Sequence, residues 1–376
     1  MTPTANKKFR VLIVDDSAFM RKVLETILNA DATLQVVGHA KDGREAVSLA
    51  ESLKPDVITM DINMPHVDGL QATAQIMTTN PRPIVIVSSE SKEGASSTLK
   101  SLELGAIEFV AKASGAIDLD MQSVREELLR KVKMAAKVRV VRTASRLAAT
   151  LQAGSSAPAT TPRPAAPAVH SASANPDQRF PVVVLAASTG GPATVMRLAP
   201  GFTKEFPGAV ILVQHMPASF TRQYAAQLAE FTEIPVKEAE NGETLQPGNF
   251  YICPGGQHLK VNPRGRIQLD AATGRINGYL PNIDVTMETV AVFAGALSIG
   301  AVLTGMGADG AQGAKAIKKA GGLVIAQDEA TSVIFGMPAE AIKLEVVDQV
   351  LGIDDIYAAI EKRVLALSRA SLAGVR

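Results

Sequence analysis

The sequence predicts an α/β protein of two doubly wound domains, each built on a mainly parallel sheet and joined by a flexible linker. Short runs that are apolar on both faces alternate with amphipathic helical segments, as in a parallel sheet covered by helices. This alternation occurs twice, on either side of a segment with almost no large apolar side chains. At roughly 100–200 residues per domain, the 376 residues also suit two domains.

The first domain, a five-stranded α/β unit, is expected over residues 1–141. Amphipathic segments such as FMRKVLETILNA and GREAVSLAESL separate its strands, and the long amphipathic segment DMQSVREELLRKVKMAAKV closes it. The five expected strands are the apolar runs at 9–14, 34–40, 56–60, 83–87 and 107–110.

A linker is expected over residues 142–179. Its core, SRLAATLQAGSSAPATTPRPAAPAVHSASANP, consists almost entirely of small residues and proline. Such a composition cannot bury enough apolar surface to offset the entropy of folding, so an extended, flexible segment is predicted.

The second domain, again α/β, is expected over residues 180–376. The uncharged stretch from Thr289 to Ala308 has about the length of a membrane span. Four glycines interrupt it and acidic residues flank it, so we interpret it as a buried helix that turns into a buried strand. The expected strands are 181–187, 209–214, 249–254, 300–305 and 321–327.

The bulk composition restricts the partners and the compartment. A formal net charge of +1 gives no reason to expect a nucleic acid or a membrane surface as a partner. The single cysteine excludes an intramolecular disulfide and suits a reducing compartment. The apolar run near the N-terminus is too short for an export signal and ends in two aspartates. We therefore expect a cytoplasmic protein without membrane insertion, and a monomer.

Charged and hydroxyl side chains follow the expected strands of the first domain. Asp15 and Asp16 end the first strand, Asp61 ends the third, Ser88 follows the fourth and Lys112 the fifth. In a doubly wound sheet these ends meet at one edge, where ligands bind. Three carboxylates in one place repel unless a cation joins them, and Mg²⁺ prefers oxygen ligands. The pattern predicts a site that receives a phosphoryl group on a carboxylate.

Plainer interpretations of each position stay open. Asp16 or Ser17 could cap the helix that begins near Ala18. Asp61 could be a loop acid, and Lys112 a solvated charge. The coincidence of all these positions on one edge favours the phosphoryl-receiving site.

In the second domain, Ser188 lies where the strand VVVLAA is expected to end and a helix to begin. The stretch AASTG approaches the nucleophile-elbow pattern G-x-S-x-G, with Ala186 in place of the first glycine. Small neighbours let the backbone turn sharply and let a substrate carbonyl approach. STGGP could also be a helix cap or a turn that holds phosphate. The spacing G-x-G-x-x-G is missing, which disfavours dinucleotide binding.

A nucleophilic serine needs a base, and the base needs an acceptor. His215 ends the strand AVILVQ on the same edge as Ser188, so we favour it over His258, which we place in a glycine loop. Asp309 follows the strand GAVLTG and is the candidate acceptor. A lone histidine at a strand end is more often structural, and Asp309 could belong to a turn. Cys253 is a rival nucleophile that we expect to be a small buried residue.

The first domain resembles a response-regulator receiver domain from Phe9 to about Lys137. The matching stretches are VLIVDDSAFMR, DVITMDINMPHVDGL, VSSES and EFVAKA. The resemblance implies that a sensor histidine kinase phosphorylates Asp61, and that Asp15, Asp16 and Asp61 hold Mg²⁺. The chain departs from the family where Ala113 replaces the proline that usually follows the lysine.

The second domain resembles the catalytic domain of the chemotaxis protein-glutamate methylesterases from about Phe180 to Leu367. The matching stretches are AASTGGP, VQHMP, PGGQHL and LTGMGADGAQG. The resemblance implies a triad of Ser188, His215 and Asp309, and a substrate groove lined by PGGQHL and TGMG. It further implies demethylation of glutamate methyl esters and deamidation of glutamines on chemoreceptors.

The mechanism expected from this resemblance places the oxyanion near the backbone of Thr189 and Met306. The esterase reaction itself is expected to need no cofactor. The rival interpretation is a response regulator whose output domain only binds a partner.

Overall fold

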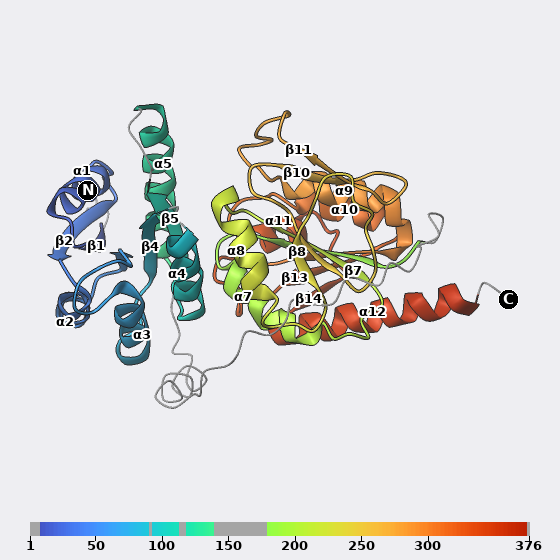
Figure 1. The fold of residues 1–376 in the computed structure, drawn as a ribbon, viewed down its shortest axis with the longest axis horizontal. Helices are drawn as coiled ribbons and strands as arrows, with labels where there is room; N and C mark the ends of the chain where they lie inside the picture. Colours follow the sequence, from blue (N-terminus) through green and yellow to red (C-terminus); the bar gives the residue numbers. More distant parts are fainter. Residues whose placement is uncertain (1–7, 90–91, 113–117, 139–178, 374–376) are drawn as a thin grey trace, which may run out of the picture. The chain divides into compact units, whose positions relative to one another are not determined.

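The computed structural model of the protein describes residues 8–89, 92–112, 118–138 and 179–373 (Figure 1). The expected linker, apart from Arg179, and the departure at Ala113 lie outside these residues. Each half of the chain forms an α/β unit around its own mainly parallel sheet, which confirms the predicted fold class.

The first half contains a five-stranded sheet in the order β2-β1-β3-β4-β5. Helix α1 packs with α5, and α2 packs with α3. The order places β1, β3, β4 and β5 side by side, so the residues that follow these strands share one edge. The strands are β1 (Phe9–Val14), β2 (Leu34–Ala40), β3 (Val57–Met60), β4 (Ile84–Ser89) and β5 (Glu108–Lys112). The helices are α1 (Ala18–Asn29), α2 (Gly43–Leu53), α3 (Gly69–Thr79), α4 (Lys92–Glu103) and α5 (Asp118–Ala135).

Helix starts in the first half are set by local side-chain caps. Ser17 precedes α1, and its hydroxyl accepts from the backbone N–H of Met20 at 3.3 Å. Asp42 and Asp68 cap α2 and α3 in the same way. A side-chain oxygen in this position satisfies one of the free N–H groups of the first turn. Of the two capping candidates named from the sequence, Ser17 is the cap of α1.

The second half contains a seven-stranded sheet in the order β14-β13-β12-β6-β7-β9-β8 and an antiparallel pair, β10 and β11. Every neighbouring pair in the large sheet is parallel. Its strands are β6 (Val182–Ala187), β7 (Ala209–Gln214), β8 (Val236–Glu238), β9 (Phe250–Ile252), β12 (Ser298–Val302), β13 (Leu323–Gln327) and β14 (Gln349–Leu351). The pair is β10 (His258–Val261) and β11 (Ile267–Asp270).

Helices cover both faces of the large sheet. Alternate residues of β6, such as Val184, share a buried cluster with Met287 and Val290 of α9. Successive side chains of a strand point to opposite faces, so Leu185 lies on the other side, where α7 and α12 pack together. Figure 1 shows α9 and α10 side by side and α12 across the sheet from them. The helices are α7 (Gly191–Leu198), α8 (Ala218–Leu228), α9 (Ile283–Ala294), α10 (Ala311–Lys319), α11 (Met337–Lys343) and α12 (Ile353–Ala373).

The structure departs from the expected strands in two ways. The edge strands β8 and β14 and the pair β10–β11 were not predicted, because three or four residues with exposed or charged positions give no clear alternation. The strand expected at 300–305 spans Ser298–Val302 instead. Beyond it the backbone N–H of Thr304 donates to the side chain of Gln327 at 2.8 Å, in place of a backbone carbonyl of a neighbouring strand.

Candidate functional sites

Three neighbouring strands of the large sheet end in polar residues. Ser188 follows β6, His215 follows β7, and Asp309 lies in the loop after β12. Because β12, β6 and β7 are adjacent and parallel, these residues meet at the carboxyl edge of the sheet. Strand order also reverses about β6, the topological position at which such sheets bind ligands.

The three side chains form one hydrogen-bonded chain. His215 Nδ1 lies 3.1 Å from Ser188 Oγ, and His215 Nε2 lies 2.8 Å from Asp309 Oδ2. The carboxylate can only accept, so the ring proton is assigned to Nε2 and Nδ1 is left to accept from the serine. The imidazole is turned relative to the serine-protease arrangement, in which Nε2 faces the serine. Either ring nitrogen can act as the base.

Small residues make room for Ser188. A Cβ added at Gly305 would lie 2.8 Å from Ser188 Cβ and 2.2 Å from Met337 Sδ. Gly190 adopts φ +75°, and a Cβ there would lie 2.5 Å from Val333 Cβ. Gly190 and Gly305 therefore have no room for a side chain. Ser188 itself is 8% exposed.

The Asp309 carboxylate is buried and held by backbone donors. Its Oδ2 accepts from the N–H of Ile283 at 2.8 Å, and its Oδ1 accepts from the N–H of Asp284 at 3.0 Å. These donors belong to the first turn of α9, where a negative charge is stabilised. These hydrogen bonds fix the carboxylate in front of His215.

An aromatic ring covers His215. Tyr279 stacks on the imidazole with ring centroids 4.4 Å apart and planes 13° apart. Its hydroxyl points to the carbonyl of Met306 at 3.5 Å. The stack restricts the rotation of the imidazole and links it to the loop that follows β12.

The alternative base and the alternative nucleophile are buried elsewhere. His258 begins β10 and is not in a glycine loop; its Nδ1 accepts from the N–H of Asn282 at 3.0 Å, and its Nε2 lies 2.7 Å from the carbonyl of Gly274. Both ring nitrogens are thus used in holding backbone. Cys253 is fully buried, and burial raises the pKa of its thiol. Neither group reaches Ser188.

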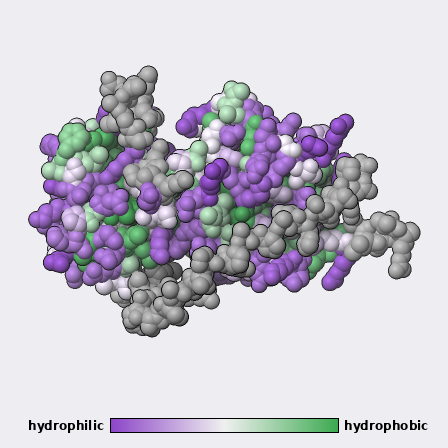
Figure 2. Space-filling model, viewed as in Figure 1, coloured by the Kyte–Doolittle hydropathy of each residue, from purple (hydrophilic) through white to green (hydrophobic). Residues whose placement is uncertain are grey.

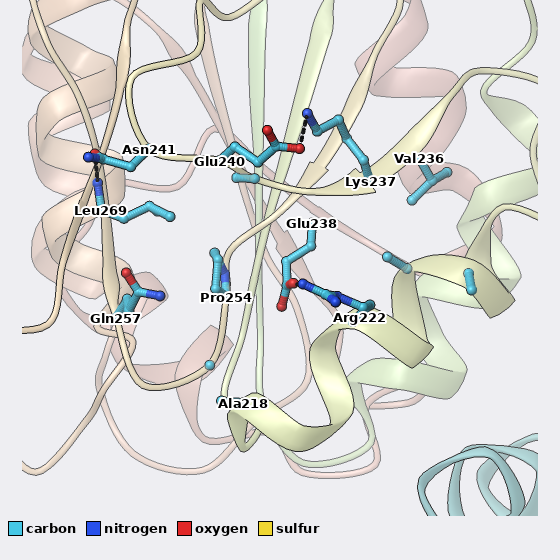
Figure 3. A pocket seen from close by; sticks show the side chains of 14 residues that line it. Ala218, Arg222, Val236, Lys237, Glu238, Glu240, Asn241, Pro254, Gln257 and Leu269 are labelled. Atoms are coloured by element: carbon cyan, nitrogen blue, oxygen red, sulfur yellow. Dashed lines mark hydrogen bonds and ion pairs between the residues drawn. The ribbon is translucent and has the colours of Figure 1, made fainter. Parts of the chain in front are cut away.

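A hollow lies at the same edge of the sheet, beside β8 and β9. Its volume is about 800 Å³, and Figure 3 shows Arg222, Glu238 and Glu240 around it. Arg222 pairs with Glu238 at 3.5 Å, and Lys237 pairs with Glu240 at 2.9 Å. Pro254, Gly255 and Gln257 of the stretch PGGQHL line this hollow. His258 and Leu259 of that stretch are fully buried, so only its first part is available to a ligand.

The carboxyl edge of the smaller sheet gathers acidic groups. Ligand atoms of Asp15, Asp16 and Asp61 all lie within 4.8 Å of one another. Asp15 and Asp61 are buried, and Asp16 is exposed. Asp15 Oδ1 also accepts from the N–H of Ser17 at 2.9 Å. Three oxygen donors at this spacing, open to solvent on one side, fit a Mg²⁺ ion that keeps several waters.

Ser88 and Lys112, the other two residues predicted for this edge, lie at the ends of β4 and β5. The Ser88 side chain is buried, and its hydroxyl lies 3.5 Å from the carbonyl of Gly94. Lys112 is half-buried. Both strands belong to the sheet that carries Asp61, as the sequence pattern requires.

Sequence reasoning missed several residues around the serine site. Tyr279 lies in a segment without periodicity, and nothing in the sequence marks it. Asp284 begins the stretch DVTMETVAVFAGAL, for which a buried helix is predicted, but no local pattern shows that its side chain bonds to another helix. Gln214 gave a weaker signal, as a polar residue that ends an apolar strand. Its Nε2 donates to the carbonyl of Ser188 at 2.8 Å and so fixes the turn.

Within the described ranges, no helix is both long enough and apolar enough to cross a membrane. In Figure 2 the visible face is mostly hydrophilic, with small hydrophobic areas.

Comparison with known proteins identifies the family. The family model described as CheB methylesterase matches residues 183–360, and that of the response regulator receiver domain matches residues 11–152. A protein-glutamate methylesterase/protein-glutamine glutaminase of Pyrococcus abyssi is 42% identical, with 94% of this chain and 93% of that protein covered. A namesake in Symbiobacterium thermophilum is 41% identical, with 97% and 99% covered. The crystal structure of the Thermotoga maritima CheB methylesterase catalytic domain is 39% identical, covers 49% of this chain and 98% of its own, and gives a TM-score of 0.47. The chain belongs to the protein-glutamate methylesterase/protein-glutamine glutaminase family.

Proposed function

We propose that this protein is a phosphorylation-activated serine esterase that removes methyl groups from glutamate methyl esters of chemoreceptors and deamidates receptor glutamines. The continuous hydrogen-bonded chain of Ser188, His215 and Asp309 carries the proposal. The names of the relatives supply the reaction, and the receiver match supplies the control.

In the proposed reaction Ser188 Oγ attacks the ester carbonyl while His215 Nδ1 takes its proton. The C–O bond to the methoxy group then breaks, and His215 returns the proton to the leaving methanol. Water attacks the acyl-enzyme with His215 again as base, releasing the glutamate. With a glutamine substrate, ammonia leaves in place of methanol. Asp309 holds the ring and stabilises the imidazolium that forms.

The oxyanion is assigned to backbone N–H groups near Thr189 and Met306. Thr189 directly follows the nucleophile, and Met306 follows Gly305, whose backbone packs against Ser188. Preorganised backbone donors at a developing negative charge contribute a large share of catalysis in acyl transfer. Tyr279, which stacks on His215, also donates from its hydroxyl to the carbonyl of Met306 in this loop.

In the receiver half, Asp61 is the proposed phosphoacceptor and a sensor histidine kinase the proposed donor. Asp15, Asp16 and Asp61 would hold Mg²⁺. When bound, the ion neutralises the charge of the carboxylates and of the incoming phosphoryl group. Ser88 and Lys112 would hold phosphoryl oxygens, Ser88 through a hydrogen bond and Lys112 as a point charge. Both halves are proposed to act in the cytoplasm, in a monomer.

The rival function, an output domain that only binds a partner, is not favoured. A binding surface has no need of a hydroxyl, an imidazole and a carboxylate in one hydrogen-bonded chain.

The deciding experiment measures methanol release from receptor-bearing membranes methylated in advance. Ser188→Ala should lower the rate by about 10³- to 10⁶-fold with the melting temperature unchanged, because triad members act as a unit. Cys253→Ala is the matched control and should keep activity per folded molecule. Near-normal turnover by Ser188→Ala would refute the assigned nucleophile.

A further inference from the structure

Helices α9 and α10 pack together and are joined by reciprocal hydrogen bonds at their N-termini. Near the start of each helix lies an aspartate whose carboxylate accepts from backbone N–H groups at the start of the other helix. Asp309, two residues before α10, accepts from the backbone N–H groups of Ile283 and Asp284. Asp284 Oδ1 accepts in return from the N–H groups of Gly310 at 2.9 Å and Gly313 at 2.7 Å.

The start of α10 depends on this exchange. Gly310 is its N-cap residue and has no side chain with which to cap the helix. Its φ is +95°, and a Cβ added there would lie 3.1 Å from Ile283 Cγ2, so the position favours glycine over any other residue. Asp284 therefore supplies, from α9, the acceptor that a serine or aspartate normally supplies locally. The backbone it holds is the peptide directly after Asp309.

We propose that Asp284 is a positioning residue for the esterase reaction, whose Oδ1 holds the Asp309–Gly310 backbone so that Asp309 Oδ2 stays on His215 Nε2. The proposal rests on the proposed function of the triad. Asp284 does not contact the serine or the imidazole through any hydrogen bond among the described residues. Its effect passes through Asp309, whose two oxygens are both tied to the neighbouring first turn.

The acceptor atom of Asp284, and not its charge, is the essential feature. Both hydrogen bonds end on one oxygen, which the amide oxygen of asparagine can replace. The charge itself is unfavourable: burial, with help from the charge of Asp309, raises the pKa of Asp284 to about 6, although the N–H groups of Gly313 and Gly310 oppose this. Glu288 on the same helix and Glu340, which lines the adjacent cavity of about 330 Å³, are further acids around it.

The test uses the full-length protein and compares Asp284→Asn, Asp284→Glu and Asp284→Ala. Glutamate keeps the charge but moves the oxygen by one methylene, so Asp284→Glu and Asp284→Ala should lower kcat for methanol release by about 10- to 100-fold. Asp284→Asn should stay within about threefold of the unsubstituted protein. KM should change by less than about twofold in all three, because substrate contacts are untouched.

Glu288→Gln is the matched control, since it removes an exposed acid one turn further along α9 and should leave kcat unchanged. A higher kcat in Asp284→Asn than in Asp284→Glu supports the proposal even if Asp284→Ala does not fold. Asp284→Glu with unchanged kcat, or Asp284→Asn as impaired as Asp284→Glu, would overturn it. Labelling of Ser188 by phenylmethylsulfonyl fluoride should give the same ranking without a receptor. That second measurement judges Asp284 even if the unsubstituted protein releases no methanol.

Discussion

The two sheets of this protein use the same edge for different chemistry, and their aspartates show why. In the first half, Asp15, Asp16 and Asp61 have ligand atoms within 4.8 Å of one another, a spacing that fits a shared cation. In the second half, Asp309 accepts from two backbone N–H groups and from His215. The first edge therefore groups carboxylates with one another. The second edge ties its carboxylate to the start of a helix and to an imidazole.

The scaffold fixes where a carboxylate lies, and the groups around it determine what it can do. A carboxylate already bonded to a helix start is a fixed electrostatic partner for a histidine. A carboxylate grouped with others suits a ligand role, and its function depends on what binds. The acidic cluster of the first half and the hydrogen-bonded Asp309 of the second half are thus two environments that can be changed separately.

Removing the imidazole breaks the second environment outright. His215→Ala should lower kcat for methanol release by about 10³- to 10⁶-fold without loss of folding, since the serine loses its base. His258→Ala should do the reverse, lowering the free energy of unfolding by about 2–4 kcal/mol through lost buried hydrogen bonds. Thermal melting and kcat measured together separate the two. A larger kcat loss in His258→Ala than in His215→Ala would mean that the base is misassigned.

Removing the metal or the phosphoacceptor breaks the first environment. A small phosphodonor with Mg²⁺ should raise the rate of methanol release by about tenfold or more, a shift of only ~1.4 kcal/mol in the population of an active state. Chelation with EDTA, or Asp61→Ala, should abolish this rise and leave the basal rate unchanged. Activation that persists in Asp61→Ala would show that the phosphoryl group goes elsewhere.

Deleting residues 1–141 tests whether the receiver half restrains the esterase. The truncated protein should have a higher basal rate than the unphosphorylated full chain and no response to the phosphodonor. A truncated protein that is no more active than the full chain would indicate that the receiver acts by another route, such as recruitment to receptors.

Changing the ring over the imidazole weakens the second environment without breaking it. Tyr279→Leu should lower kcat by roughly 2- to 10-fold, because a stacked aromatic pair contributes about 0.5–1.5 kcal/mol. Tyr279→Phe keeps the stack and loses only the 3.5 Å hydroxyl contact, so its kcat should match that of the unsubstituted protein. Equal losses in both variants would assign the effect to the hydroxyl and the Met306 loop.

The smallest effect concerns stability against pH. The pKa of Asp284 is raised from 3.8 to about 6, so between these values the folded state binds more protons than the unfolded state. This group therefore stabilises the fold most below pH 4, and its contribution falls as the pH rises through 6. The free energy of unfolding of Asp284→Asn, relative to that of the unsubstituted protein, should therefore rise by about 1 kcal/mol from pH 4 to pH 8, after allowance for partial solvent exposure. Urea unfolding at both pH values measures it, and an unchanged difference would argue against a raised pKa.

Sequence patterns alone are enough to predict the fold class and the residues at the strand ends. Apolar runs such as VVVLAA and FRVLIV identify buried parallel strands, and the polar residue that follows each run then falls on one edge for topological reasons. Ser188, His215, Asp309 and the acidic residues of the first half could be named in this way because the signal is local. Their catalytic and phosphorylation roles stay predictions.

Which groups meet, and how they are held, depends on the packing of elements that are distant in the chain. The stack of Tyr279 on His215, the use of both nitrogens of His258 and the exchange between Asp284 and Asp309 join segments far apart in the chain. No periodicity encodes such contacts, because each depends on the packing of two elements whose local patterns are independent. The turned imidazole has the same cause, because the ring takes the orientation in which Nδ1 reaches Ser188 and Nε2 reaches Asp309, two residues from separate segments.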